Sequence, residues 1–199
     1  MFNRNRTIFL IFVISIFSSA VFAASSPRMR PYAGIGLLVF SSSNTDLNQD
    51  LQLPLYEEPG LLRIGMLNSS SSPGNAWLFG SSEKTPPLIV SAQKGDWVRV
   101  IYDDAGREAW LEPQNRGHFE SWDQFLRQQT GSMIPGLPSH YYLLHQQPGG
   151  KSLTALTPKQ VFKVLKLENT WSMVLTSQAQ IGWLRWCDDD GRLLVRLDH

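Results

Sequence analysis

The feature that most constrains the fold is a series of short strand-like segments between residues 88 and 113. Residues 88–90 are Leu-Ile-Val, residues 97–102 are rich in aromatic and β-branched side chains, and residues 109–111 are Ala-Trp-Leu. Polar turns separate them, first Lys-Gly-Asp and then Asp-Asp-Ala-Gly. Short strands joined by polar turns about every ten residues indicate a small β-barrel or β-sandwich.

The second half of the chain repeats this pattern. The hexapeptide Leu-His-Gln-Gln-Pro-Gly at 144–149 corresponds to Leu-Tyr-Glu-Glu-Pro-Gly at 55–60. The strand-like segments at 161–167, 169–174 and 181–184 then correspond, in order, to those at 88–90, 95–100 and 108–111. A unit that recurs in this way indicates two copies of one fold.

A second alignment of the two halves competes with the first. Residues 183–192 also resemble residues 97–107, since both begin with Trp and continue into an acidic turn with Gly and Arg. We favour the first alignment, because it matches three blocks in order. It leaves residues 188–197 as an additional hairpin that ends in a final strand.

One helix is predicted between the two copies. Over residues 121–129 the large apolar side chains Trp122, Phe125 and Leu126 fall on one helical face. Ser121 and Gln124 have the spacing of a capping box, in which each side chain binds the other residue's backbone N–H. We interpret this helix as a connector whose aromatic face packs against a neighbouring domain.

The N-terminus has the three parts of a secretory signal peptide. Arg4 and Arg6 give a positive start, residues 8–17 are almost entirely apolar, and Val-Phe-Ala at 21–23 resembles a small-residue cleavage site. An uncleaved anchor is the alternative, but the apolar run is shorter than the roughly 20 residues that span a bilayer. We expect cleavage after Ala23 or Ala24, a periplasmic or secreted product, and no membrane span afterwards.

Charge and cysteine content exclude several classes of function. Without residues 1–23, which hold two Arg and no acids, the 18 basic residues fall to 16 against 17 acidic ones, a net charge of −1. This balance does not favour nucleic acid or an anionic membrane as a partner. The single cysteine, Cys187, cannot form an internal disulfide, and we interpret it as a structural thiol.

With these residues identified, both halves resemble bacterial SH3 domains of exported envelope proteins. The shared pattern is Leu-Tyr-x-x-Pro-Gly, an apolar strand, Gly-Asp-Trp-x-x-Val and Gly-Arg-x-x-Trp-Leu, matched over about residues 51–113 and more weakly over 142–186. The second copy has His145 in place of Tyr56 and lacks the Gly-Asp before Trp171. The resemblance implies an all-β fold of two tandem SH3-like barrels joined by a short helix.

The predicted organisation has five parts. They are a signal peptide (1–23), an N-terminal lead and first strand (24–50), a first SH3-like domain (51–113), a connector helix and linker (114–138), and a second SH3-like domain (139–199).

The resemblance also implies a ligand groove lined by aromatic side chains. The predicted ligand-binding residues are Tyr56, Trp97 and Trp110 in the first copy and Trp171 and Trp183 in the second. In the first copy, strand alternation places Trp97 on the face opposite Val98 and Val100, which is the open face if the valines are core. We expect Trp110, between Ala109 and Leu111, to be a core residue.

No catalytic, metal or cofactor site is predicted. Cys187 lies beside three acidic residues, which disfavour a reactive thiolate, and the four histidines lack metal-ligand spacing. The acidic pairs at 57–58 and 103–104 resemble solvated turn residues more than a glycosidase pair. We therefore expect a non-enzymatic module that binds a cell-wall peptide, peptidoglycan or an envelope protein. The alternatives are an accessory subunit of an exported assembly and, last, a small hydrolase.

Overall fold

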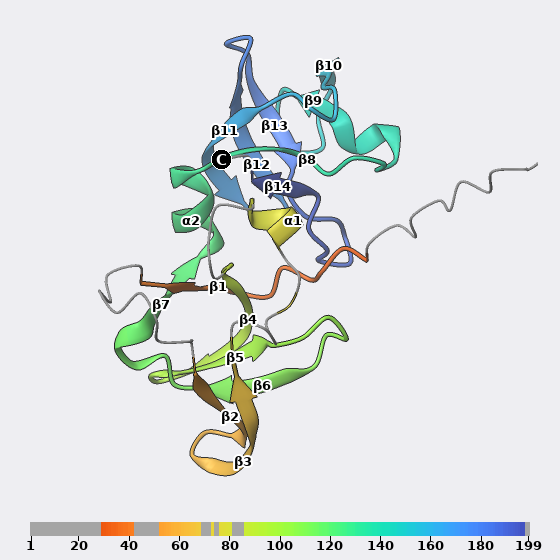
Figure 1. Cartoon of the computed structure of the whole chain (residues 1–199). Coiled ribbons are helices and arrows are strands. Elements are labelled where there is room, and N and C mark those ends of the chain that lie inside the picture. Colours follow the sequence, from red (N-terminus) through yellow and green to blue (C-terminus); the bar gives the residue numbers. More distant parts are fainter. Residues whose placement is uncertain (1–28, 42–51, 69–72, 74–75, 81–85, 198–199) are drawn as a thin grey trace, which may run out of the picture.

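The computed structural model describes residues 29–41, 52–68, 73, 76–80 and 86–197 of the chain. The predicted signal peptide lies outside the described residues. The strands form two antiparallel sheets, which we name the N-lobe sheet and the C-lobe sheet. The N-lobe occupies the lower half of the view in Figure 1 and the C-lobe the upper half.

The N-lobe sheet contains the first seven strands. They are β1 (Gly36–Phe40), β2 (Leu53–Glu58), β3 (Leu61–Leu67), β4 (Leu88–Lys94), β5 (Trp97–Ile101), β6 (Glu108–Leu111) and β7 (Gly117–Ser121). The C-lobe sheet contains the next seven. They are β8 (Thr130–Met133), β9 (Leu143–His145), β10 (Ser152–Ala155), β11 (Phe162–Glu168), β12 (Trp171–Thr176), β13 (Ile181–Arg185) and β14 (Val195–Leu197).

The two sheets have the same topology. The strand order is β3-β2-β6-β5-β4-β1-β7 in the N-lobe and β10-β9-β13-β12-β11-β8-β14 in the C-lobe, so each strand has a counterpart seven strands later. The pairing of Tyr56 with Trp110 recurs as the pairing of His145 with Trp183. This is the first of the two alignments considered above, and residues after Asp188 form the additional hairpin and β14.

The prediction of an all-β fold is confirmed, and the described strands leave both sheets open. β3 and β7 are the end strands of one sheet, β10 and β14 those of the other, and neither pair of end strands is joined within the described residues. The sheets also extend beyond the predicted domain limits. β1 is the first strand expected within residues 24–50, and it joins the N-lobe sheet, while β7 and β8 lie in the segment expected as a connector.

Strand alternation builds the N-lobe core. Val98 and Val100 of β5 are buried, while Arg99 between them is exposed. β1 and β4 are buried on both faces, because one face of each strand contributes Leu38 and Val90 to the N-lobe core and the other contributes Leu37 and Ile89 to a second core. A strand that is buried on both faces has a continuous apolar sequence, as residues 37–40 and 88–90 do.

The second core extends from the outer face of β1 and β4 into the C-lobe. Between the lobes lie α2 (Trp122–Gln128) and the single turn α1 (Ala76–Phe79), both visible at the centre of Figure 1. Phe79 of α1 packs against Trp122 and Phe125 of α2, and Trp122 also contacts Trp186, the residue after β13. We name these four aromatic residues the interlobe layer. This layer belongs to one continuous core with residues of both sheets, so the lobes form a single packed unit.

The helix prediction is confirmed at its N-terminus. Ser121 caps α2 through a bond from the backbone N–H of Gln124, and the Gln124 side chain accepts the backbone N–H of Ser121. The aromatic face of α2 is buried, as expected. The segment after it is not a simple linker, because Thr130–Met133 is β8, the counterpart of β1.

The N-terminal segment packs against the C-terminal hairpin. The backbone N–H of Ala33 donates to Gly191 O (2.8 Å), and the N–H of Leu193 donates to Pro31 O (3.0 Å). Arg30 adds an ion pair to the buried Asp188, with 2.8 Å between Nη2 and Oδ2. Residues about 160 positions apart are thereby held together.

Candidate functional site

Each lobe has an aromatic pair on the outer face of its sheet. In the N-lobe, Tyr56 of β2 and Trp97 of β5 meet edge to face, with ring centroids 5.3 Å apart and planes at 86°. In the C-lobe, His145 of β9 and Trp171 of β12 meet at 5.2 Å and 83°. The imidazole therefore takes the place of the phenol ring against the same tryptophan.

The turn before each tryptophan explains why the missing Gly-Asp does not alter this geometry. The β4–β5 hairpin turns at Gly95, whose φ is +59°, and the β11–β12 hairpin turns at Asn169, whose φ is +51°. Apart from glycine, asparagine is among the residues that best tolerate this left-handed conformation. Trp171 thus follows its turn at the same distance as Trp97, since Glu168 pairs with Trp171 as Lys94 pairs with Trp97.

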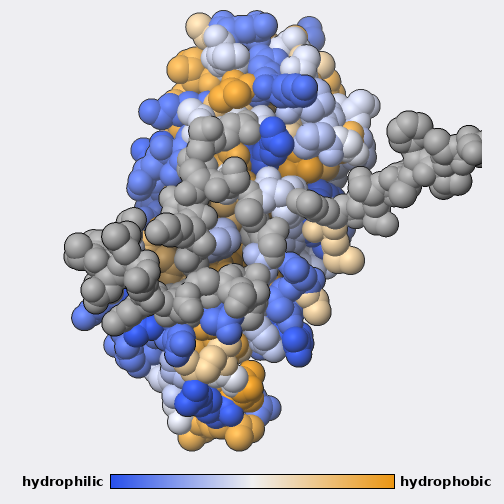
Figure 2. Space-filling view, viewed as in Figure 1, coloured by the Kyte–Doolittle hydropathy of each residue, from blue (hydrophilic) through white to orange (hydrophobic). Residues whose placement is uncertain are grey.

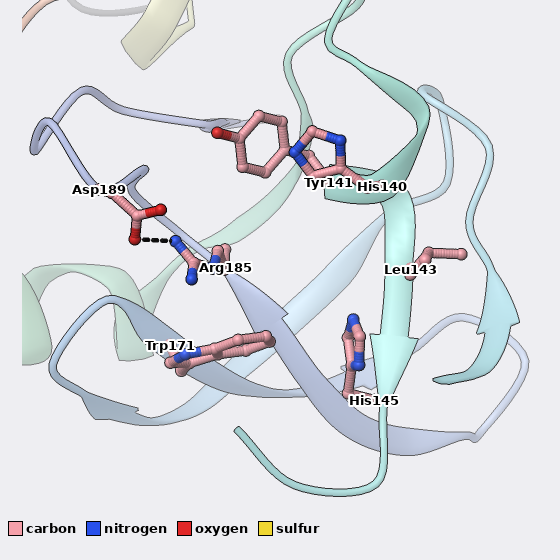
Figure 3. A pocket seen from close by; sticks show the side chains of 7 residues that line it. All are labelled: His140, Tyr141, Leu143, His145, Trp171, Arg185 and Asp189. Carbon is pink, nitrogen blue, oxygen red and sulfur yellow. Dashed lines mark hydrogen bonds and ion pairs between the residues drawn. The ribbon is translucent and has the colours of Figure 1, made fainter. Parts of the chain in front are cut away.

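A cavity of about 240 Å³, which we name the C-lobe pocket, lies beside the second aromatic pair (Figure 3). It is lined by His140, Tyr141, Leu143, His145, Trp171, Arg185 and Asp189. The N-lobe has a cavity of about 380 Å³ elsewhere, lined mainly by polar residues of its turns, Asp96 and Glu112 among them. Of the five predicted ligand-binding residues, Trp171 is the one that lines either of these two cavities.

The sides of the C-lobe pocket are mainly aromatic, and its charged side chains are Arg185 and Asp189. The rings of His140 and Tyr141 lie 4.1 Å apart, in the turn η2 (Ser139–Tyr142) that leads into β9. The guanidinium carbon of Arg185 lies 5.2 Å from the centre of the Trp171 ring, a cation–π distance. Arg185 also forms an ion pair with Asp189, shown as a dashed line in Figure 3.

Hydrogen bonding orients the His145 ring. Its Nδ1 donates to the carbonyl oxygen of Gly150 at 2.7 Å, because a carbonyl can only accept. In the neutral ring Nε2 is then an acceptor. Gly150 follows Gly149, whose φ of +67° matches the +73° of Gly60 at the equivalent turn of the N-lobe.

The structure places all five predicted ligand-binding residues on outer sheet faces, in two separate groups. Tyr56, Trp97 and Trp110 are together in the N-lobe, and Trp171 and Trp183 are together in the C-lobe. The expectation that Trp110 is a core residue is wrong. Ala109 and Leu111 are buried, and successive strand residues face opposite sides, so Trp110 between them lies half-buried on the outer face.

Sequence reasoning predicted Trp171 but none of the other six residues that line the pocket. His140 and Tyr141 lie in a turn that carries no motif, and Asp189 lies in the acidic turn at 188–191, for which no binding role was predicted. The alignment of the two copies contained a signal for Arg185. Ser172 pairs with Leu184 as Val98 pairs with Leu111, so the next residue, Arg185, is the counterpart of Glu112.

Cys187 is unsuited to nucleophilic chemistry. Burial, and then the charge of Asp188, raise the pKa of its thiol to about 11. We expect iodoacetamide at about pH 8 to leave the folded protein unlabelled and to label it fully in denaturant, because only the thiolate reacts. Mass spectrometry measures the added mass. Rapid labelling of the folded protein would contradict this environment.

Two further findings concern the described part of the chain. It contains no group of three or more His, Cys, Asp or Glu residues placed to hold a metal ion. None of its helices is long and apolar enough to cross a membrane.

The paired acidic residues form ordinary turns. Asp103 accepts the backbone N–H and the side chain of Arg107 across the β5–β6 turn, and Glu57 and Glu58 are exposed at the end of β2. Burial by itself would raise the pKa of Asp103, but these hydrogen bonds lower it below its ordinary value.

A scan of protein-family models finds none that matches this chain, and a search of curated proteins finds no match either.

Proposed function

We propose that this chain is an exported, non-enzymatic binding module with two SH3-like domains, which recognises peptide or peptidoglycan in the cell envelope. The observation that carries the proposal is the recurrence of one aromatic pair, Tyr56–Trp97 and His145–Trp171, in nearly the same geometry on the outer faces of two sheets of the same strand order. Half-buried aromatic rings with open faces suit extended peptides and glycans, which offer apolar edges for stacking.

Co-sedimentation of residues 24–199 with purified peptidoglycan tests the proposal. We expect saturable binding that falls at least about tenfold in Trp171→Ala and in Trp97→Ala, because truncating a central aromatic residue commonly costs about 2 kcal/mol or more. Ile181→Ala is the matched control. It removes an exposed apolar side chain from β13 that does not line the C-lobe pocket, and binding should not change.

Two results would count against the envelope proposal. One is the absence of sedimentation above an unrelated exported protein, and the other is equal binding by both tryptophan variants and the control.

A second candidate function, an accessory subunit of an exported assembly, is favoured by the β2–β3 hairpin. Leu61 and Leu62 are each 67% exposed at its end and Ile64 is 47% exposed, whereas the equivalent C-lobe turn has Gly150 and Lys151. This end of the N-lobe includes an apolar area at the bottom of Figure 2. Exposed apolar groups of this kind commonly mark protein interfaces.

The hairpin suggests its own experiment. Leu61→Ser with Leu62→Ser should abolish capture of a specific envelope protein by the immobilised chain, while leaving peptidoglycan binding intact. Capture that survives the double substitution would remove the hairpin from consideration.

A further inference from the structure

The C-lobe pocket differs from the matching N-lobe face in charge. Arg185 and Glu112 occupy equivalent positions, each one residue beyond the last core leucine of its strand. The aromatic pairs of the two lobes are otherwise alike. Such a reversal at one position of two similar sites changes which ligand charge each can accept.

We propose that the C-lobe pocket binds the carboxylate of a peptide, with Arg185 as its anchor. This inference rests on the proposed function and specifies the chemistry of one of its two sites. Arginine presents a planar fork of N–H donors that matches a carboxylate, and stacking on an aromatic ring holds the fork in one plane. The Trp171 ring at 5.2 Å provides that stacking in this pocket.

The existing partner of Arg185 can be displaced. The Asp189 side chain is 82% exposed, and within the described part of the chain its carboxylate is the only hydrogen-bond acceptor of the Arg185 guanidinium, through Nη1. Exposed ion pairs contribute only about 0–1 kcal/mol, so a ligand carboxylate that also contacts the aromatic walls can replace Asp189. Asp189 thus occupies the position that the ligand carboxylate takes.

The remaining walls suit the rest of a peptide. Tyr141, Leu143 and the rings of His140 and His145 offer apolar and aromatic surface around the arginine. When the His145 ring carries one proton, Nδ1 donates it to Gly150 O and Nε2 is an acceptor for a peptide N–H. A volume of about 240 Å³ accommodates about one or two small residues.

Three capped tripeptides test the inference and separate the sources of the carboxylate. Acetyl-Ala-Glu-Ala-amide has a side-chain carboxylate, acetyl-Ala-Gln-Ala with a free C-terminus has a terminal one, and acetyl-Ala-Gln-Ala-amide has none. Titrations followed by NMR of the tryptophan indole N–H signals, with Trp171 assigned through Trp171→Phe, give each Kd. We expect at least one carboxylate peptide to bind about tenfold or more tightly than the amide, as a charge-assisted hydrogen bond predicts.

Three variants make the result specific to the arginine. Arg185→Gln should weaken binding of the carboxylate peptide, raising its Kd about tenfold. Asp189→Asn should tighten binding of the same peptide about two- to fivefold, because it removes a weak competing ion pair. The matched control is Arg99→Gln, which removes an ion-paired arginine from the outer face of the N-lobe sheet and should change nothing. A purely structural role for Arg185 would not produce the gain in Asp189→Asn.

The outcomes distinguish this inference from the proposed function. Peptidoglycan binding by the wild type, with no preference for carboxylate peptides and no effect of Arg185→Gln or Asp189→Asn, overturns the carboxylate site and leaves the envelope module standing. Carboxylate-dependent peptide binding without peptidoglycan binding overturns the envelope proposal and supports the site. Equal Kd values for all three tripeptides would also overturn the inference.

Discussion

Trp122→Ala is expected to lower the free energy of unfolding by about 3–5 kcal/mol, the range for truncating a large buried aromatic side chain. Trp122 is 5% exposed and lies in the interlobe layer, where its ring contacts Phe79, Phe125 and Trp186. Its Nε1 donates to the carbonyl oxygen of Ala33 at 2.7 Å. The substitution therefore opens a cavity and leaves a buried acceptor without this donor.

Urea denaturation followed by circular dichroism measures this loss. Because one core includes residues of both lobes, the wild type should unfold in one cooperative transition. Trp183→Ala is the control: its side chain is half-buried on an outer face, and the loss should be about 1 kcal/mol. If Trp122→Ala and Trp183→Ala lost the same free energy of unfolding, the buried position of Trp122 in the interlobe layer would be contradicted.

The second large effect is expected at Asp188. Asp188→Ala should cost about 2–3 kcal/mol, less than the 3–5 kcal/mol for breaking a fully buried ion pair, because the Arg30 side chain is 24% exposed. Asp188 also accepts the backbone N–H groups of Arg192 and Asp190 at 2.8 and 3.1 Å. The variant therefore loosens both the C-terminal turn and the N-terminal segment that packs on it.

The stabilisation that the Asp188 carboxylate provides is expected to decrease at acidic pH. Burial alone would raise the pKa of Asp188, but hydrogen bonds from Arg192 and Arg30, together with the charge of Arg30, lower it below the ordinary 3.8. A carboxyl group whose pKa is lower in the folded state stabilises the protein above its unfolded pKa and loses that effect as pH falls through the folded value. The advantage of wild type over Asp188→Ala should thus be full near neutrality and shrink below about pH 4.

Urea denaturation of the wild type and of Asp188→Ala, from neutral pH to below about pH 4, tests whether the stability difference shrinks on acidification. Asp103 is retained in both proteins, so its titration cancels in the comparison. A stability difference that grows on acidification would contradict the described environment of Asp188.

Local patterns of the sequence determined much of this protein. The alternation of Val98 and Val100 with Arg99 identified the inner and outer faces of β5, and the Ser121–Gln124 spacing identified the start of α2. The recurrence of Pro-Gly turns and tryptophans identified the two copies. These features are predictable because strand alternation, capping and turn formation depend on residues close together in the chain.

The same local rule was applied incorrectly at Trp110. Its neighbours Ala109 and Leu111 are core residues, and that fact alone places Trp110 outside. The strands β7 and β8 were not predicted, and β1 was predicted as a strand but not as a member of a sheet. Each has its partners far away in sequence, as β1 pairs with β7 and β4, and no short pattern specifies such pairing.

Only the tertiary structure decided where the candidate site lies. Arg185 reaches the Trp171 ring because β13 is hydrogen-bonded beside β12, and His145 reaches it from a strand more than twenty residues earlier. The interlobe layer and the Arg30–Asp188 ion pair likewise join segments that chain topology alone brings together. The physical reason is that packing free energy is summed over the whole core, so the charge and shape of a pocket depend on contacts that no local segment contains.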